Sequence, residues 1–277
     1  MKTNYHTHSV FCDGNNTIEE MAQTALEKGF DILGFSSHSM YPFSSEYHMN
    51  INQFESYCNK VHEVQKLYEG KLQIQLGFEA DYIAGVTCPS MSRYKQFNAD
   101  FLIGSVHYVP GNKGYFEADG SSNSVMEGIK TAFNGNVKKA VQTYFALERE
   151  MLLHGDFTFM GHPDLIRKQN GKNVLFDENA SWYKNELKET VKAMAKNGCC
   201  VEINTSPIVR YGLSTPFPSP YFLSLMKEKN IPVTLGSDCH NKELLDAWFT
   251  EGIEYIKKAG YTEITYYTDG SYKFQKI

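Results

Sequence analysis

The sequence predicts an α/β fold built around a parallel sheet. Short apolar runs bounded by turn residues alternate along the chain with longer segments whose apolar residues recur at helical spacing. This alternation is typical of successive βαβ units, which either close into a barrel or stay open as a doubly wound sheet. Barrels of about 200–250 residues routinely fold as one unit, and the sequence contains no linker rich in Pro, Ser or Gly. We therefore expect residues 1–277 to form a single domain.

Seven short apolar segments are predicted to be strands. In chain order they are residues 3–8, 32–36, 72–78, 101–105, 157–161, 200–204 and 232–237. In parallel α/β folds, ligands bind at the carboxyl ends of the strands. The residues that follow these segments are therefore the first place to look for a functional site.

The helical segments carry recognisable ends. Thr17 and Glu20 have the spacing of a capping box at the start of a helix over residues 17–28, and Gly29 favours a stop. A helix over residues 181–196 is expected to end at Asn197-Gly198 in the same way. The remaining helices are predicted at residues 52–68, 220–229 and 242–258.

Two further regions have a less regular pattern. Residues 108–157 are expected to hold a loop and two helices, because Asn134-Gly135-Asn136 interrupts the helical spacing. At the C-terminal end, Asp269-Gly270 favours a tight turn and predicts a β-hairpin formed by residues 263–267 and 272–274.

Composition and charge exclude several classes of protein. The chain is 42% hydrophobic and 21% charged, as in ordinary globular proteins, and its net charge of −5 argues against a nucleic-acid binder. No basic start followed by an apolar run indicates a signal peptide, and no apolar run indicates a membrane span, so no membrane partner is expected. The six cysteines have irregular spacing without a Cys-x-x-Cys pair, which favours reduced thiols in a cytoplasmic protein. The oligomeric state stays open.

Six of the nine histidines fall at the ends of the predicted strands, together with acidic residues. The candidate metal ligands are His6, His8, Asp13, His38, Glu79, His107, His162, Asp238 and His240. Imidazole and carboxylate together suit Zn, Mn or Fe. At three or four protein ligands per ion, nine donors are too many for one ion, so the sequence predicts a site for two to three divalent metal ions.

Each candidate also has a simpler interpretation. A single histidine at a strand end can be a hydrogen-bonded core residue, Glu79 could cap a helix, and Asp13 could belong only to a turn with Gly14. All of these candidates lie at or after the carboxyl ends of strands, which are expected to meet, and their number at one place favours the metal site. Glu202 and Asn204 stay ambiguous between ligand contact and loop stabilisation. The other three histidines, which are not expected in the site, are His48, His62 and His154.

A His-x-His start at His6, single His or Glu ligands on successive strands and a closing Asp238-x-His240 resemble the PHP (polymerase and histidinol phosphatase) family. The resemblance spans nearly the whole chain, and the segment from Gly161 to Arg167 is most similar to the stand-alone histidinol-phosphate phosphatases. It implies a distorted seven-stranded (β/α)7 barrel of the PHP type. One departure is visible, because Ser37 stands where many members have an acidic residue.

The resemblance also implies a three-metal arrangement. The first metal would be held by His6, His8, Glu79 and Asp238, the second by Glu79, His107 and His162, and the third by Asp13, His38 and His240. The activity implied is hydrolysis of a small phosphomonoester, most of all histidinol phosphate, by a hydroxide that bridges two metals.

Further site residues follow from that activity. Arg167 and Arg210 follow the fifth and sixth strands, and either could bind phosphate. Asp238 or His240 could serve as the catalytic acid for the leaving group, although a tight metal ligand is a poor acid. The acidic loop Glu117-Ala118-Asp119 could contact the cationic amine of histidinol.

Three alternatives remain at this point. A PHP phosphoesterase could act on another substrate, such as a nucleotide, a sugar phosphate or a phosphotyrosyl peptide. A metal-dependent amidohydrolase on a related barrel usually uses a bridging Lys, and no Lys lies at the end of any predicted strand. A proofreading module of a polymerase is expected to have extra domains or a basic surface, and the sequence predicts neither.

Overall fold

The computed structural model describes residues 1–41, 43, 45–171 and 174–277. Its main sheet has seven strands in the order β1-β2-β3-β4-β7-β8-β9, and all neighbouring pairs are parallel. The strands are β1 (Thr3–Asn4), β2 (Ile32–Phe35), β3 (Gln73–Asp81), β4 (Phe101–Ser105), β7 (Phe159–Met160), β8 (Cys200–Asn204) and β9 (Val233–Gly236). All seven predicted strands are present, although β1 and β7 are shorter than expected.

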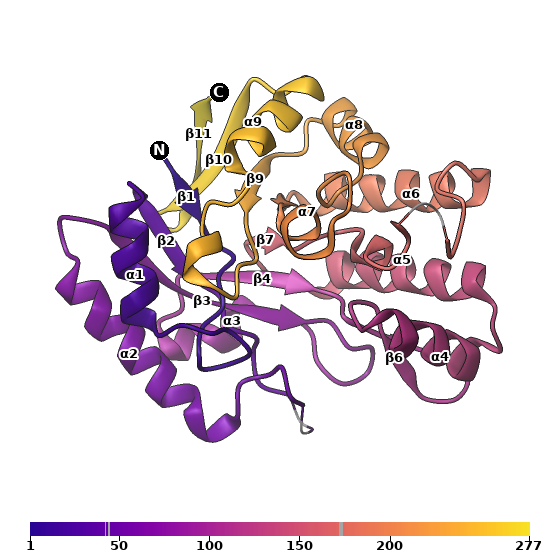
Figure 1. Ribbon diagram of the computed structural model, residues 1–277, viewed down its shortest axis with the longest axis horizontal. Coiled ribbons are helices and arrows are strands. Elements are labelled where there is room, and N and C mark those ends of the chain that lie inside the picture. The colour runs from indigo at the N-terminus through magenta and orange to yellow at the C-terminus, as the bar shows by residue number, and fades with distance from the viewer. Residues whose placement is uncertain (42, 44, 172–173) are drawn as a thin grey trace.

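The sheet curls into a nearly closed barrel. Its first and last strands meet just past their ends, where Thr7 forms a parallel bridge with Cys239 and the His8 amide donates to the Cys239 carbonyl at 3.0 Å. Figure 1 shows helices α1 and α2 at one side of this sheet and α5 and α6 at the other. The barrel form of the α/β prediction is therefore confirmed.

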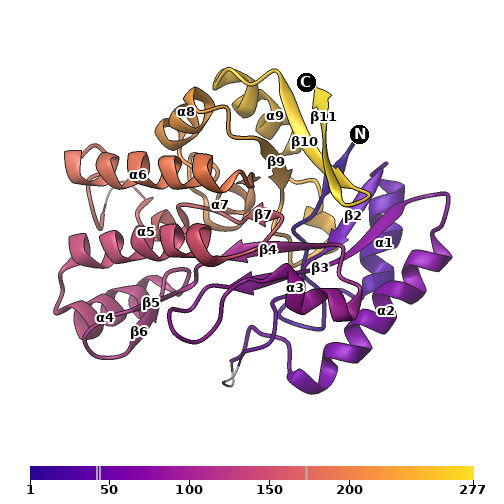
Figure 2. The same ribbon diagram turned by 180° about the vertical axis from the view of Figure 1, so that it is seen from behind.

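The helices lie mostly where the sequence predicts them. They are α1 (Ile18–Glu27), α2 (Phe54–Leu67), α3 (Met91–Tyr94), α4 (Ser122–Phe133), α5 (Val137–His154), α6 (Ser181–Asn197), α7 (Ser206–Tyr211), α8 (Pro220–Glu228) and α9 (Phe249–Lys258). The capping box is present, since the Thr17 hydroxyl accepts from the Glu20 amide and the Glu20 carboxylate accepts from the Thr17 amide. Figure 2 shows α4, α5 and α6 stacked at one end of the molecule.

The prediction of one helix over residues 242–258 is wrong. The structure has a short 3₁₀ helix, η5 (Lys242–Leu244), then a break, then α9, and Trp248 adopts a left-handed φ of 65°. The backbone in the break bonds to other elements, because Asn4 donates to the Leu245 carbonyl at 2.9 Å and Thr205 to the Ala247 carbonyl at 2.9 Å. These tertiary bonds replace the bonds of a continuous helix.

Several elements were not predicted from the sequence, and two of them, a β-hairpin and a helix, lie near the candidate site. The expected loop before α4 contains a small antiparallel hairpin, β5 (Tyr108–Pro110) and β6 (Tyr115–Glu117). Helix α7 follows β8, where only a loop was expected. Both elements lie beside the carboxyl end of the barrel and contribute side chains to its cavity.

The opposite end of the barrel is closed by apolar side chains. A buried cluster separate from the main core contains Tyr5, Ile32, Phe101, Ile103, Phe159 and Cys200. Its strand residues alternate with those that face the helices, such as Leu102, so this cluster fills the barrel interior. The predicted C-terminal hairpin, β10 (Glu263–Thr268) and β11 (Ser271–Lys276), covers it, and the Tyr5 hydroxyl donates to the Tyr267 carbonyl at 2.9 Å. The carboxyl end of the barrel is left for the site.

All six cysteines are unpaired. Within the residues that the structure describes, no helix has the length and apolar character needed to cross a membrane.

Candidate metal centre

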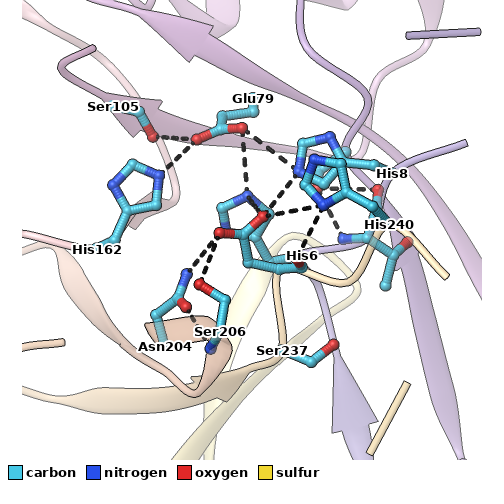
Figure 3. A network of polar contacts seen from close by, with 12 residues as sticks. His6, His8, Glu79, Ser105, His162, Asn204, Ser206, Ser237 and His240 are labelled. Carbon is cyan, nitrogen blue, oxygen red and sulfur yellow. Dashed lines mark hydrogen bonds and ion pairs between the residues drawn. The ribbon is translucent and has the colours of Figure 1, made fainter. Parts of the chain in front are cut away.

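The candidate ligands gather at the carboxyl end of the barrel. His6 and His8 follow β1, His38 follows β2, and Glu79 lies near the end of β3. His107 and His162 follow β4 and β7, and Asp238 and His240 follow β9. Figure 3 shows the side chains of His6, His8 and His162 grouped around Glu79. The parallel sheet thus brings together residues that are more than two hundred positions apart.

Glu79 lies at the centre of this group and is 1% exposed. One carboxylate oxygen is 3.0 Å from His38 Nδ1 and 3.3 Å from His6 Nε2. The other is 2.8 Å from His162 Nε2 and accepts a hydrogen bond from the Ser105 hydroxyl at 2.7 Å. Burial alone would raise the pKa of Glu79, but the surrounding imidazoles hold it well below its usual value. Glu79 is therefore a carboxylate with one oxygen facing each of two groups of histidines.

Asp238 occupies a strained position at the end of β9. Its φ of 48° is left-handed, a conformation that Asp tolerates better than most residues. One oxygen lies 3.1 Å from His8 Nε2, and the other accepts from the Ser206 hydroxyl at 3.1 Å. Burial opposes ionisation, but His6 and His8 lower the pKa of Asp238 well below its usual value. This conformation aims an ionised carboxylate at the imidazoles.

Asp13 joins a second group of histidines. Its carboxylate lies 2.9 Å from His240 Nε2, 3.6 Å from His8 Nδ1 and 3.8 Å from His38 Nε2. Burial, with His240 and His38 nearby, lowers the pKa of His8 to about 3, so its imidazole is neutral, the form that binds metals. The turn at Gly14 is also real, since a Cβ there would lie 2.5 Å from the Ser9 amide nitrogen. Asp13 therefore lies in a turn and also beside the histidines of the candidate site.

All nine predicted ligands belong to sets whose donor atoms lie within 4.8 Å of one another. The sets are His8-Asp13-His38-His240, His6-His8-Asp238, His6-Glu79-His162 and His38-Glu79-His107. Four of these atoms are buried and have no hydrogen-bond partner among the described residues: His6 Nε2, His8 Nε2, His38 Nδ1 and Asp13 Oδ1. Most buried polar atoms in proteins are hydrogen-bonded, so a group of unpaired nitrogen and oxygen atoms that face one another at this end of the barrel fits divalent cations.

His48, which was not expected in the site, lies beside one of its histidines. Its ring nitrogen lies within reach of His38 and Asp81 in a further possible ligand set. Asp81 also accepts a hydrogen bond at 2.8 Å from His107 Nδ1, which leaves His107 Nε2 directed toward Glu79. Asp81 was not recognised in the sequence, because it extends β3 beyond the predicted strand.

A cavity of about 320 Å³ opens above the candidate ligands. Arg210 lines it from α7, with Nη1 2.8 Å from His240 Nδ1 and 3.9 Å from the Asp238 carboxylate. Lys168 lines it as well, donates to the Asp119 carbonyl, and lies 4.1 Å from the centre of the Tyr211 ring. Lys168 is therefore a second cationic residue in the cavity, and it was not predicted from the sequence.

The structure places Arg167, one of the two predicted phosphate-binding residues, outside the cavity that the candidate ligands line. Its side chain is 6% exposed and does not line the cavity. Nε donates to Glu178 at 2.9 Å, and the guanidinium lies 3.5 Å from the buried Asp164. The cause is the 3₁₀ helix η3 (Leu165–Arg167), in which successive side chains are rotated by about 120°. Arg167 therefore points into the protein, and the next residue, Lys168, points into the cavity.

The fold and the set of possible ligands define a class of protein: a (β/α) barrel with a site suited to divalent metal ions at the carboxyl ends of its strands. The chain matches the PHP domain family over residues 4–206, and it belongs to that family. A relative from Deinococcus radiodurans, named a probable histidinol-phosphatase, is 27% identical over 264 residues that cover 94% of this chain and 95% of the relative.

Two solved structures share the fold. HisK from Listeria monocytogenes superimposes with a TM-score of 0.79 at 22% identity, covering 90% of this chain and 99% of the other. The histidinol phosphate phosphatase from Lactococcus lactis, solved with zinc, L-histidinol and phosphate, has a TM-score of 0.71 at 19% identity and 98% coverage of both chains. These likenesses confirm the PHP-type barrel predicted from the sequence.

Proposed function

We propose that this protein is a metal-dependent phosphatase that hydrolyses histidinol phosphate to histidinol and phosphate. The observation that carries the proposal is the cavity, in which seven of the nine candidate ligands, all except His6 and His8, meet two cationic side chains and an acidic rim. The name of the Deinococcus radiodurans relative supports the same substrate. We further propose that the reaction serves histidine biosynthesis in the cytoplasm.

The metal ions in this proposal are two to three Zn, Mn or Fe ions. His6, His8, Glu79 and Asp238 would hold the first, Glu79 with His107 and His162 the second, and Asp13, His38 and His240 the third. Such ions lower the pKa of bound water and neutralise charge on phosphate oxygens. Glu79 supports the division between the first two ions, because one of its oxygens lies 3.3 Å from His6 Nε2 and the other lies 2.8 Å from His162 Nε2.

Arg210 and Lys168 are the proposed phosphate-binding residues. Both cations line the cavity, and Arg210 lies beside Asp238 and His240. A guanidinium can bind two phosphate oxygens at once, and a lysine ammonium adds a point charge.

The leaving alcohol needs a proton, for which Asp238 and His240 are the catalytic candidates. The pKa of Asp238 is held well below its usual value, so this carboxylate is a poor proton donor. His240, whose imidazole lines the cavity beside Arg210, is the better candidate of the two.

The acidic rim suits the amine of histidinol. Glu117 and Asp119 line the same cavity as Arg210 and Lys168, so a substrate with phosphate at one end and a cation at the other would meet opposite charges. Burial and the neighbouring Asp119 raise the pKa of Glu117, as expected for two carboxylates that share a site.

A panel of phosphomonoesters tests this function. The metal-loaded protein should show a higher kcat/KM for histidinol phosphate than for a nucleotide, a sugar phosphate, a phosphotyrosyl peptide or p-nitrophenyl phosphate. The double variant E117Q/D119N should lose that preference while keeping its activity on p-nitrophenyl phosphate. If another member of the panel is hydrolysed faster, the protein would still be a phosphatase, but histidinol phosphate would not be its preferred substrate.

A further inference from the structure

A buried carboxylate lies directly behind the metal centre. Glu202 is in the middle of strand β8 and is 2% exposed, yet it is not one of the candidate ligands. An ionised group at this depth is costly unless hydrogen bonds satisfy it. The partners of Glu202 therefore indicate what it does.

The two oxygens of Glu202 contact two different candidate ligands, His6 and His162. One lies 2.8 Å from His6 Nδ1. The other accepts from the His162 backbone amide at 3.2 Å and from the Asn204 side-chain amide at 3.0 Å. The same amide nitrogen of Asn204 lies 3.3 Å from Asp238. One carboxylate thus connects residues that follow β1, β7 and β9.

The contact with His6 fixes which ring nitrogen faces the centre. An Nδ1–H that donates to Glu202 leaves the Nε2 lone pair free to bind a cation. His6 Nε2 is buried, has no hydrogen-bond partner in the part of the chain that the structure describes, and belongs to two ligand sets, His6-His8-Asp238 and His6-Glu79-His162. The second contact holds the backbone of His162, a member of the latter set.

The neighbouring strand leaves space for this carboxylate. Gly236 on β9 is close to Glu202 across the β8–β9 pairing, and a Cβ at Gly236 would lie 2.0 Å from the Glu202 oxygen that faces His6. A distance this short excludes any side chain unless the carboxylate moves. Gly236 gives evidence for the role of Glu202 that is independent of the hydrogen bonds.

We propose that Glu202 is a positioning residue that holds His6 in the Nδ1–H tautomer and anchors His162, so that both imidazoles present Nε2 to divalent cations. None of its hydrogen bonds reaches the set His8-Asp13-His38-His240. Glu202 therefore acts on the ions bound by His6 and His162. This role depends on the metal centre and is independent of which phosphomonoester is hydrolysed.

The variant E202Q tests the proposal, because it keeps the shape of the side chain and changes its hydrogen bonding. An amide has one acceptor oxygen, so it cannot accept from both His6 and His162. Loss of a partner behind a metal-binding histidine typically weakens metal affinity by about 10–100-fold. We expect that loss for zinc, measured as metal retained per chain during titration with a competing chelator. The matched control is E148Q, which changes a buried glutamate outside the centre.

A second variant, G236A, displaces the carboxylate without changing its chemistry, and it should weaken zinc binding in the same direction. Thermal unfolding of the metal-free proteins separates this role from a purely structural one. The proposal predicts cooperative unfolding of metal-free E202Q together with reduced zinc affinity. Zinc affinity equal to that of E148Q would overturn it, and so would loss of cooperative unfolding in metal-free E202Q.

Discussion

At the scale of single residues, Glu79 is the most informative position. Five imidazoles lie within 3.6 Å of its carboxylate, those of His6, His8, His38, His107 and His162. Two oxygens that face separate histidines are the arrangement expected of a bridging ligand. The residue types and their places after strands were visible in the sequence. The pairing of particular nitrogens with particular oxygens was not, because it depends on side-chain rotamers.

The variant E79Q tests the bridging role. An amide keeps the size of the side chain but removes the negative charge that would connect two cations, so we expect phosphatase activity to be abolished. Elemental analysis should show fewer metal ions per chain than in the unchanged protein. Full activity in E79Q would show that Glu79 does not bridge.

The two arginines predicted as phosphate ligands should behave differently. R210A removes a cavity cation and should raise KM for the phosphomonoester, with little change in the free energy of unfolding. R167A leaves the buried Asp164 without its cation, and breaking a buried pair typically costs about 3–5 kcal/mol. Steady-state kinetics and denaturant unfolding of both variants check this contrast. An unchanged unfolding free energy in R167A, with a raised KM, would restore the original assignment.

At the scale of elements, patterns in the sequence predicted what is locally encoded. The α1 capping box, the α6 stop and the Asp269-Gly270 turn each depend on residues only a few positions apart. Tertiary contacts determine the features of the elements that were not predicted. The break before α9 arises from hydrogen bonds with Asn4 and Thr205, and the short helix η3 turns Arg167 away from the cavity that Lys168 lines. The spacing of apolar residues in the sequence does not reveal these tertiary contacts, so they could not be predicted.

Strands β2 and β3 contain glycines that make room inside the barrel. A Cβ at Gly77 would lie 2.4 Å from the Phe101 ring, and one at Gly34 would lie 2.7 Å from it. The Phe101 ring is fully buried, so it has little freedom to move. We expect G77A to lower the free energy of unfolding by about 1–3 kcal/mol through overpacking. Urea unfolding measures this change, and a variant as stable as the parent would mean that the barrel interior adapts.

At the scale of the whole molecule, the net charge of −5 does not describe the site. Two or three divalent ions would add a charge of about +4 to +6 at the carboxyl end of the barrel, where Arg210 and Lys168 also lie. The match to the PHP domain family and the curled parallel sheet confirm the fold class. The single domain over residues 1–277 stays a prediction.

Buried carboxylates outside the centre should give the fold a pH dependence. Burial raises the pKa of Glu148 well above its usual value, so the folded state binds a proton that the unfolded state releases above about pH 4.3. This contribution to stability is complete below that pH and is lost as pH rises toward the folded-state pKa. The unfolding free energy of E148Q, measured by chemical denaturation, should therefore fall less than that of the parent protein between about pH 5 and pH 8. Equal decreases in the two proteins would mean that Glu148 is ionised in the fold.

The central claim is that nine donors at one end of the barrel hold catalytic metal ions. The most direct test measures phosphate release from histidinol phosphate by the purified protein before chelation, after chelation and after metal is restored, with metal content determined at each step. We predict two to three divalent ions per chain, loss of activity when they are removed, and recovery when they are returned. Undiminished hydrolysis by protein that contains no metal would contradict the claim.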